Sequence, residues 1–328
     1  MTQFYDARGN VYGVVSPAYL CSQGIDVPQS AALAASTRET WAASAIASEC
    51  GWGSSPHPAD AKAHRCDGLL VGPFQTQSPF DLLIINTDGS LAERSGNGLT
   101  IFAQALTDQG LMTQGGELRV HHDKSDAASP VATSVEPAMH EQVPGFWLAL
   151  GQPMFGALAV GAVGVGTQAV GQHDFNSVPA LVTLNPQWAH SQFVRVGNPH
   201  CVTLVEQVSA LPDNDTMHQA ALFMPLRTIA FAPPVGAGQP CAGGVNLQWV
   251  ARDIDNRLIA RVFERGEGPT ASSGTSACAV ACAAWRAGWV ECADVAVVMP
   301  GGIAPVRLQV EDGTLLRVSL FGTARAKS

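Results

Sequence analysis

Hydrophobic residues in this chain fall mostly in short runs whose spacing is typical of β-strands. Clear examples are GLLVGPF at 68–74, FDLLIINT at 80–87, VNLQWVA at 245–251 and IARVFERG at 259–266. Val, Ile and Leu dominate these runs, and Gly, Pro or Asp bounds them. Further runs of the same kind are GVVSP, ELRVHH, FWLALG, FVRVG, VTLV, VAVVMP and LLRVSLF. The pattern predicts a protein built mainly from short strands.

Helical patterns are few. GNGLTIFAQALTDQG follows Ser95 and GTSACAVACAAWRAG follows Ser273, and both end in glycine, as helices often do. The alanine-rich segment 31–49 predicts a third helix.

One long segment, 144–171, contains no charged residue and could suggest a membrane helix. Gln152, Pro153 and a series of glycines interrupt it, and it has no basic flank. Buried strands joined by glycine turns are therefore the prediction for this segment. The first ten residues also lack the basic start and apolar run of a secretory signal, so we expect a cytoplasmic protein that does not enter the membrane.

The composition is that of a globular protein of about two domains. The chain has 328 residues, of which 46% are hydrophobic and 14% are charged. Its net charge of −9 argues against nucleic acid as a partner, because phosphate binding relies on a surplus of Lys and Arg.

The eight cysteines are scattered, with no C-x-x-C pair and no zinc-ligand spacing with histidines. Buried reduced thiols are the expectation, and we expect no metal. The cysteines are Cys21, Cys50, Cys66, Cys201, Cys241, Cys278, Cys282 and Cys292.

Two similar tetrapeptides suggest an internal repeat. Ser-Gly-Asn-Gly begins at Ser95 and Ser-Gly-Thr-Ser begins at Ser273, about half the chain away, and each follows a strand and opens an apolar helix. A helix N-terminus presents unpaired N–H groups and a partial positive charge, which suit a carboxylate and the negative charge that develops beside it during proton abstraction. A serine before a helix is also an ordinary N-cap, so a ligand-binding role and a purely capping role both remain open.

Several motifs together resemble the diaminopimelate epimerase family, and they occur in the family's order over nearly the whole chain. The motifs are FYDARGNVYGVV, CDGLLVG, IINTDGSLAERSGNG, LALGQP, VRVGNPHCV, VNLQWV, VFERGEGPTASSGTSACA and VMPGG. The resemblance implies an α/β (α+β) fold of two pseudo-symmetric domains. Each would be a β-structure wrapped around a central helix, with the active site in the cleft between them. We expect one domain over 1–130, completed by a C-terminal strand at about 314–328, and the other over 131–313.

The resemblance also implies a cofactor-independent isomerase of amino-acid metabolism, in the family's case of lysine biosynthesis. Its partner would be a small carboxylate or amino-acid substrate, and a homodimer is among the open oligomeric states. Substrate-binding positions fall on Asn10, Asn86, Asn198, Asn246, Glu264 and Arg265, and the paired helix ends on Gly96, Asn97, Gly274 and Thr275. His200 matches a histidine near the catalytic pair, and Cys278 a cysteine that is not catalytic.

The chemistry of these positions suits a zwitterion, because arginine can clamp a carboxylate and asparagine both donates and accepts. Each also has a simpler interpretation. Asn10 and Asn86 could be turn residues, Glu264 and Arg265 an exposed ion pair, and His200 a satisfied loop histidine.

The catalytic positions depart from the family, which carries cysteine where this chain has Ser95 and Ser273. A thiol titrates near 8.5 and water near 15.7, so a serine hydroxyl costs on the order of 9 kcal/mol more to ionise. A helix dipole offsets only about 1–2 kcal/mol of this cost. We therefore expect the serines to flank the reacting carbon and His200 or Glu264 to carry the proton.

Several functions remain open from the sequence. The protein could be a racemase, epimerase or double-bond isomerase acting on a substrate with a more acidic C–H, or a catalytically silent ligand-binding homologue. It could also be a Cys-to-Ser variant of a true diaminopimelate epimerase, although Thr100, where the family often has a basic residue, indicates natural divergence. A structural role without a ligand is the remaining alternative.

Overall fold

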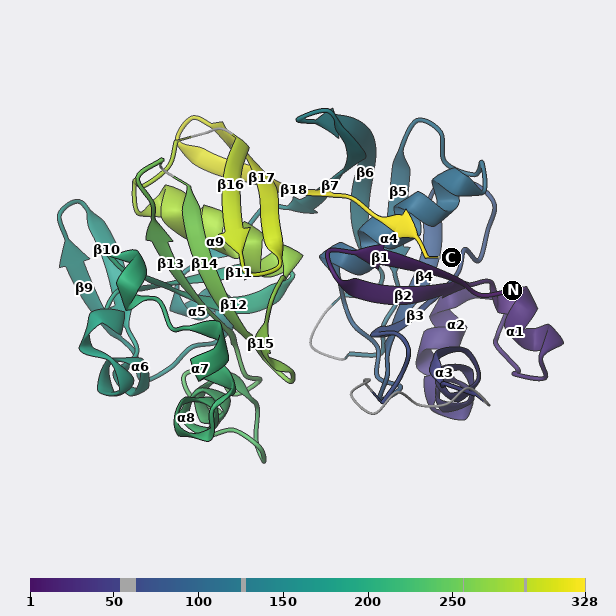
Figure 1. Cartoon of the computed structure of the whole chain (residues 1–328), viewed down its shortest axis with the longest axis horizontal. Coiled ribbons are helices and arrows are strands. Elements are labelled where there is room, and N and C mark those ends of the chain that lie inside the picture. The colour runs from purple at the N-terminus through teal and green to yellow at the C-terminus, as the bar shows by residue number, and fades with distance from the viewer. Residues whose placement is uncertain (54–62, 125–127, 256, 292–293, 328) are drawn as a thin grey trace. The chain divides into compact units, whose positions relative to one another are not determined.

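The computed structural model describes residues 1–53, 63–124, 128–255, 257–291 and 294–327 (Figure 1). The chain forms two compact units, each a mixture of strands and helices. The first comprises Met1–Leu148 together with Gly322–Ser328, and the second comprises Ala149–Phe321.

The first unit holds a sheet and one long helix, α4 (Gly96–Asp108). Its strands are β1 (Gln3–Ala7), β2 (Asn10–Val15), β3 (Gly68–Val71), β4 (Phe80–Asn86), β5 (Gly116–Val120), β6 (Val131–His140), most of β7 (Val143–Gly151), and β19 (Arg325–Ala326). Its shorter helices are α1 (Pro17–Ser22), α2 (Ala31–Ser36), the 3₁₀ turn η1 (Arg38–Thr40) and α3 (Ala42–Cys50).

The second unit contains the other long helix predicted from the sequence, α9 (Gly274–Arg286). Its strands are β8 (Met154–Phe155), β9 (Gly166–Val170), β10 (His173–Ser177), β11 (Ser191–Val196), β12 (Asn198–Leu204), β13 (Asn246–Arg252), β14 (Leu258–Glu264), β15 (Gly268–Thr270), β16 (Asp294–Met299), β17 (Gly302–Glu311) and β18 (Thr314–Gly322). Its other helical segments are α5 (Ala157–Val160), α6 (Pro179–Leu184), η2 (Pro186–Trp188), η3 (Val208–Ala210), α7 (Asn214–His218) and α8 (Ala220–Ala230).

The two units repeat one order of strand pairing. In the first, β1 pairs antiparallel with β2, β2 parallel with β3, β3 antiparallel with β4, β4 parallel with β5, and β5 antiparallel with β6. In the second, β11, β12, β13, β14, β16 and β17 pair in the same alternation. The internal repeat predicted from the two serine-glycine motifs is thus present in the fold.

A central helix lies against the strands of each unit. The α9 helix contacts β11, β12, β13, β14, β16 and β17, and all of its residues from Gly274 to Ala284 are buried (Figure 1). The α4 helix contacts β1 and β2 and is buried along most of its length. A helix buried on every side must be apolar throughout, which explains the run of small and apolar residues in ACAVACAA. The expected β-structure wrapped around a helix is confirmed.

The predicted helix over 31–49 is wrong as a single element, because α2 and α3 are separated by η1. The Thr37 hydroxyl donates back to the Leu33 carbonyl and ends α2. Trp41 then turns into the core, where its indole N–H donates to the Ala34 carbonyl at 3.0 Å. Side-chain bonds to the backbone compete with helix continuation at such a site.

The prediction of buried strands over 144–171 is correct only in part. Residues 145–148 and 150 of β7 are buried, but every residue of β9 is exposed and 157–160 form a short helix. The segment has no charged residues, but it is not apolar enough to be buried along its whole length. Glycine, alanine, threonine and glutamine make up much of it. No helix among the described residues is long and apolar enough to cross a membrane.

Seven of the eight cysteines lie in the described part of the chain, and all seven are free thiols. Six are buried, as predicted, and Cys21 is half-buried. Cys292 lies outside the described residues.

Candidate functional site

In the first unit, Ser95 is the N-cap of α4. Its backbone is extended, and its hydroxyl oxygen accepts the Gly98 N–H at 3.0 Å. Gly96 and Asn97 follow it as the first buried residues of the helix. The hydroxyl therefore has the capping role that serine plays at many helix starts.

Asn10 and Asn97 contact each other directly. The Asn97 amide donates to the Asn10 side-chain oxygen at 2.6 Å, which joins the first residue of β2 to the first turn of α4. Asn97 is 6% exposed and Asn10 is half-buried. Two of the residues that the sequence analysis expects to bind substrate are thus brought together.

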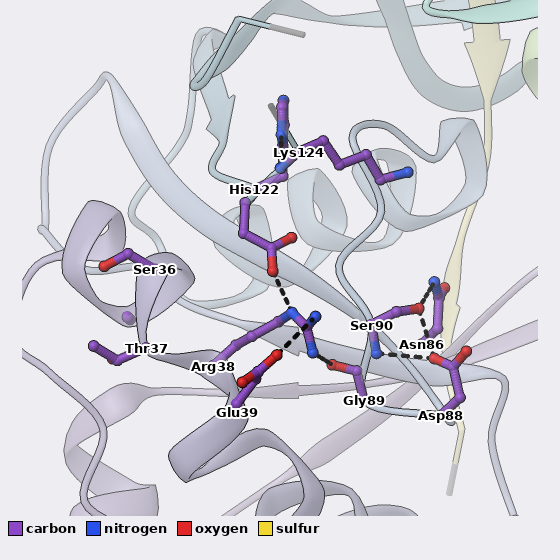
Figure 2. Close-up of polar contacts among 12 residues, drawn as sticks. Ser36, Thr37, Arg38, Glu39, Asn86, Asp88, Gly89, Ser90, His122 and Lys124 are labelled. Atoms are coloured by element: carbon purple, nitrogen blue, oxygen red, sulfur yellow. Dashed lines mark hydrogen bonds and ion pairs between the residues drawn. The ribbon is translucent and has the colours of Figure 1, made fainter. Parts of the chain in front are cut away.

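Asn86 stabilises a turn at the end of β4, where its hydrogen-bond partner is Ser90 rather than Asn10 or Asn97. Its amide donates to the Ser90 hydroxyl at 2.9 Å, and the Ser90 hydroxyl donates to Asp88 at 2.6 Å. Burial would raise the pKa of Asp88, but the hydrogen bonds from Ser90 hold it below its usual value. Figure 2 shows Asn86 and Asp88 turned toward Ser90, with Arg38 reaching the Gly89 carbonyl of the same turn.

In the second unit, Ser273 is the N-cap of α9 and is 7% exposed. Its hydroxyl oxygen accepts the Ser276 N–H at 3.4 Å. Contact with the same hydroxyl lowers the pKa of the Glu264 carboxyl group, which places this carboxyl group near the start of α9. Gly274 and Thr275 follow as buried residues of the first turn.

Glu264 ends β14, where the chain turns back through Gly266 into β15. Burial raises its pKa to about 7, the negative charge of Glu267 adds to the rise, and the bond from Ser273 opposes it. The turn explains the proximity of the two acids, because the Glu267 N–H donates to the Glu264 carbonyl at 3.3 Å. A carboxyl group near neutrality can both take and return a proton at physiological pH.

Asn246 and Arg265 form a second pair at the same end of the sheet. The Asn246 side-chain oxygen accepts the Arg265 backbone N–H at 2.8 Å, and the Arg265 guanidinium donates to the Gly243 carbonyl at 2.8 Å. Asn246 pairs with His200 in the β12–β13 ladder, and Asn198 begins β12.

His200 is fully buried inside the second unit. The Gln248 amide lies 3.0 Å from His200 Nδ1 and donates to the Ser276 hydroxyl, also at 3.0 Å. Burial lowers the pKa of His200 to about 3, and the positive charge of Arg265 adds to the effect. The imidazole is therefore neutral at physiological pH.

Gln248, Ser276 and Glu267 were not identified from the sequence. Gln248 could have been, because a glutamine inside the apolar strand VNLQWVA needs a buried partner, and it shares a strand face with Asn246 two residues before it. Glu267 could have been found from the short ERGEG turn. Among the described residues, no three His, Cys, Asp or Glu side chains gather as metal ligands would.

Comparison with known proteins identifies the family. The family profile described as diaminopimelate epimerase matches residues 192–326. A diaminopimelate epimerase of Desulfitobacterium hafniense is 30% identical over 258 residues, which cover 79% of each chain. This chain belongs to the diaminopimelate epimerase family. A second relative, diaminopimelate epimerase 2 of a Nostoc species, is 27% identical over 75% of this chain and 74% of its own.

Membership of this family places the chain among the epimerases and isomerases. Several solved structures share its fold. A probable proline racemase from Agrobacterium radiobacter aligns with a TM-score of 0.57 at 13% identity, over 100% of this chain and 92% of its own. A phenazine biosynthesis protein of the PhzF family from Bacillus anthracis aligns at 0.56 and 13% identity, over 100% and 96%. At these identities the likeness shows the fold alone.

Proposed function

We propose that this family member is a cofactor-independent isomerase that moves a proton beside the carboxylate of a small amino-acid-like or dicarboxylate substrate. Glu264 carries the proton. The observation that supports this is the Glu264 carboxyl group, which lies beside Ser273 at the start of α9 and has a pKa raised to about 7.

The serine positions explain why a carboxyl group takes this role. A serine hydroxyl is too weakly acidic to exchange protons as a thiol does, so Ser273 acts as a positioning residue for Glu264. A carboxyl group with a pKa near the working pH combines a useful population of base with a useful population of acid. Burial, together with Glu267, supplies this tuning.

The start of α9 would hold the substrate carboxylate. The first N–H groups of a helix have no acceptor within the helix, and the dipole there favours an anion. Gly274 lets a ligand come close, because it lacks a side chain. Negative charge that builds on the carboxylate during proton removal would be stabilised at the same N–H groups.

The remaining polar residues would recognise the rest of the ligand. Arg265 would bind a second carboxylate, and Asn198 and Asn246 would bind the amino or carbonyl groups near it. The first unit, taken by itself, has a comparable polar group at the start of α4, where Asn97 is held by Asn10 beside Ser95 and Gly96. Asn86 would act through the turn that it stabilises. His200 would support this set as a neutral, buried partner of Gln248.

A ligand-binding protein without turnover is the second candidate. One observation favours it, because both serine hydroxyls already cap their helices and neither is placed as a free acid. In a Cys-to-Ser variant of a true diaminopimelate epimerase, both serine hydroxyls would cap their helices in the same way. As proposals from the family, we add a cytoplasmic location, a place in amino-acid metabolism such as lysine biosynthesis, and a homodimeric state.

Proton NMR in deuterated water tests the proposal. The protein is incubated with diaminopimelate and with a panel of amino, hydroxy and unsaturated dicarboxylates, beside a variant with Ser95→Cys and Ser273→Cys. Solvent deuterium entering a substrate in the presence of the serine protein supports a non-thiol isomerase. Exchange of diaminopimelate by the double-cysteine variant alone would indicate an epimerase site disabled at two positions, and no exchange by either protein would favour the binding protein.

A further inference from the structure

Gln248 is a fully buried amide on β13, a strand whose other side chains are mostly apolar. Leu247, Trp249 and Ala251 belong to the apolar cluster on one face of this strand. Because successive side chains point to opposite faces, Gln248 lies on the other face, where its contact with Ser276 shows that α9 packs. A buried amide is stable only where hydrogen bonds replace its contacts with water, so its partners indicate what it does.

The amide nitrogen of Gln248 joins two other elements to β13. It donates to the Ser276 hydroxyl, in the first turn of α9, at 3.0 Å. It also lies 3.0 Å from His200 Nδ1 on β12, the parallel neighbour of β13. Since an amide nitrogen carries two N–H groups and can only donate, both N–H groups are used and the neutral His200 ring accepts at Nδ1. One side chain thus connects β12, β13 and α9.

Ser276 carries this connection to the start of α9. Its backbone N–H donates to the Ser273 hydroxyl at 3.4 Å, and the next N–H, that of Ala277, donates to the Ser273 carbonyl at 3.0 Å. These two bonds fix the first turn to its own N-cap, but neither reaches the sheet. The bond from Gln248 does join the turn to the sheet, at a serine that is completely covered.

The residue beside Gln248 on the same face of β13 holds another part of the candidate site. Asn246 lies two residues before Gln248, and its side-chain oxygen accepts the Arg265 N–H at 2.8 Å. Arg265 directly follows Glu264, the last residue of β14. One strand is therefore bonded both to the end of β14 and to the start of α9. These contacts fix how the two ends lie relative to each other within the second unit.

We propose that Gln248 is a positioning residue, which holds the first turn of α9 in place against β13 and beside the end of β14. The consequence for catalysis rests on the proposed function, in which the N–H groups of that turn bind the substrate carboxylate and Glu264 carries the proton. A displacement of about 1 Å in such a site can cost about a hundredfold in rate. Because Gln248 is completely covered, it acts through Ser276 and not by touching the substrate.

Gln192 supplies a matched control. It is a second buried glutamine, 2% exposed, on β11, and its amide donates to the Asp174 carbonyl of β10 at 2.6 Å. Substitution of either glutamine by methionine keeps a long, unbranched side chain and removes the N–H donors. Gln248→Met and Gln192→Met therefore each remove a buried amide, but only Gln248→Met removes the bond to α9.

Amide hydrogen exchange, followed by NMR without any ligand, tests the link between Gln248 and α9. In Gln248→Met the N–H groups of Ser276 and Ala277 should exchange roughly three to ten times faster relative to those of 281–284, later in the same helix, as the loss of one net hydrogen bond predicts. This ratio should be unchanged in Gln192→Met. An unchanged ratio in Gln248→Met, or an equal change in both variants, would overturn the proposal.

Ser276→Ala tests the same bond from its other end. The substitution removes the hydroxyl acceptor and leaves a small residue that favours the helix. It should accelerate exchange in the first turn to a similar extent, and Gln248→Met should add little to it in the double variant. Additive accelerations would show that the two residues act separately, which contradicts the proposal. Ser276→Ala alone decides the question where Gln248→Met does not fold, because an unchanged first turn in it would equally overturn the link.

Steady-state kinetics separates the positioning role from the proposed function. With the substrate found in the deuterium-exchange panel, Gln248→Met should raise KM and lower kcat, with a loss in kcat/KM of about tenfold to a hundredfold. Gln192→Met should keep kinetics close to those of the native protein. Absence of turnover by the native protein would count against the proposed function alone, and the exchange ratios would then decide the link. Native kinetics in folded Gln248→Met would overturn the positioning role, whatever the exchange ratio.

Discussion

Ser273 lies beside Glu264 at the start of α9, where its hydroxyl accepts the Ser276 N–H at 3.4 Å and its contact with the carboxyl group lowers the carboxyl pKa. A carboxyl group with a pKa of about 7 therefore lies beside a helix N-terminus. The N-cap residue there, Ser273, has a hydroxyl that ionises only far above neutral pH. Under the proposed function, this carboxyl group takes the acid–base role for which the serine hydroxyl is too weakly acidic.

The raised pKa of Glu264 predicts a pH-dependent stability. Folding favours the protonated carboxyl group, so its contribution is complete below the ordinary value of 4.5 and is lost as the pH rises through about 7. The free energy of unfolding of the native protein should therefore fall across this window relative to that of Glu264→Gln, which mimics the protonated form. Urea denaturation of both proteins across the window measures this, and a pH-independent difference would contradict it.

Glu267 should control the pKa of Glu264. Its negative charge is the second cause of the rise, after burial. The substitution Glu267→Gln removes that charge and should move the titration midpoint of Glu264 to lower pH, while Glu291→Gln, on another segment, should leave it unchanged. Carbon-13 NMR of labelled glutamate carboxyl groups reads both midpoints. An unchanged midpoint in Glu267→Gln would leave burial as the only cause.

Asn10 and Asn97 should be energetically coupled, because their amides share a hydrogen bond of 2.6 Å. Each single substitution to alanine leaves one polar partner behind, so the double variant should lose less stability than the sum of the two. We expect a coupling energy of about 0.5–1.5 kcal/mol from a double-mutant cycle in urea. Additive losses would mean that the bond contributes nothing measurable to the fold.

Gly322 should not tolerate a side chain. A Cβ atom there would lie 2.1 Å from Thr100 Oγ1 and 2.8 Å from Thr100 Cγ2. Thr100 cannot easily move, because it is 1% exposed and its hydroxyl donates to the Gly96 carbonyl at 2.8 Å. Gly322→Ala should therefore cost roughly 1–3 kcal/mol of stability.

Thermal denaturation measures the effect of Gly322→Ala, and Thr100→Ala provides the control. In the double variant the clash with Oγ1 and Cγ2 is gone, so the loss should be smaller than the sum of the two single losses. A loss in the double variant equal to the sum of the two single losses would show that the strain at Gly322 comes from another neighbour.

Much of the fold could be predicted from the sequence because its signals are local. The helices after Ser95 and Ser273 have a serine cap, an apolar run and a glycine end, and both exist as expected. The apolar runs of β4, β13 and β14 fall on strands. The prediction of a single helix over 31–49 failed because Trp41 packs in the core, and this tertiary packing overrode the helical preference of the alanines in the segment.

The site was harder to predict, because residue types alone do not give burial. The motif NPH located His200, but only the fold shows it covered and bonded to Gln248. Glu264 and Arg265 looked like neighbours that could pair as ions, yet their partners are Ser273 and Asn246 on other elements. Contacts between distant segments, rather than neighbours in the chain, decide the chemistry of each group.

Whether Glu264 carries the proton is tested most directly by comparing solvent deuterium exchange by the native protein, Glu264→Gln and His200→Gln. Each is incubated in deuterated water with the substrate found in the panel, and proton NMR follows the signal beside the carboxylate. We expect exchange by the native protein, its loss in Glu264→Gln, and retention of measurable exchange in His200→Gln. Undiminished exchange in Glu264→Gln, or loss in His200→Gln alone, would contradict this expectation.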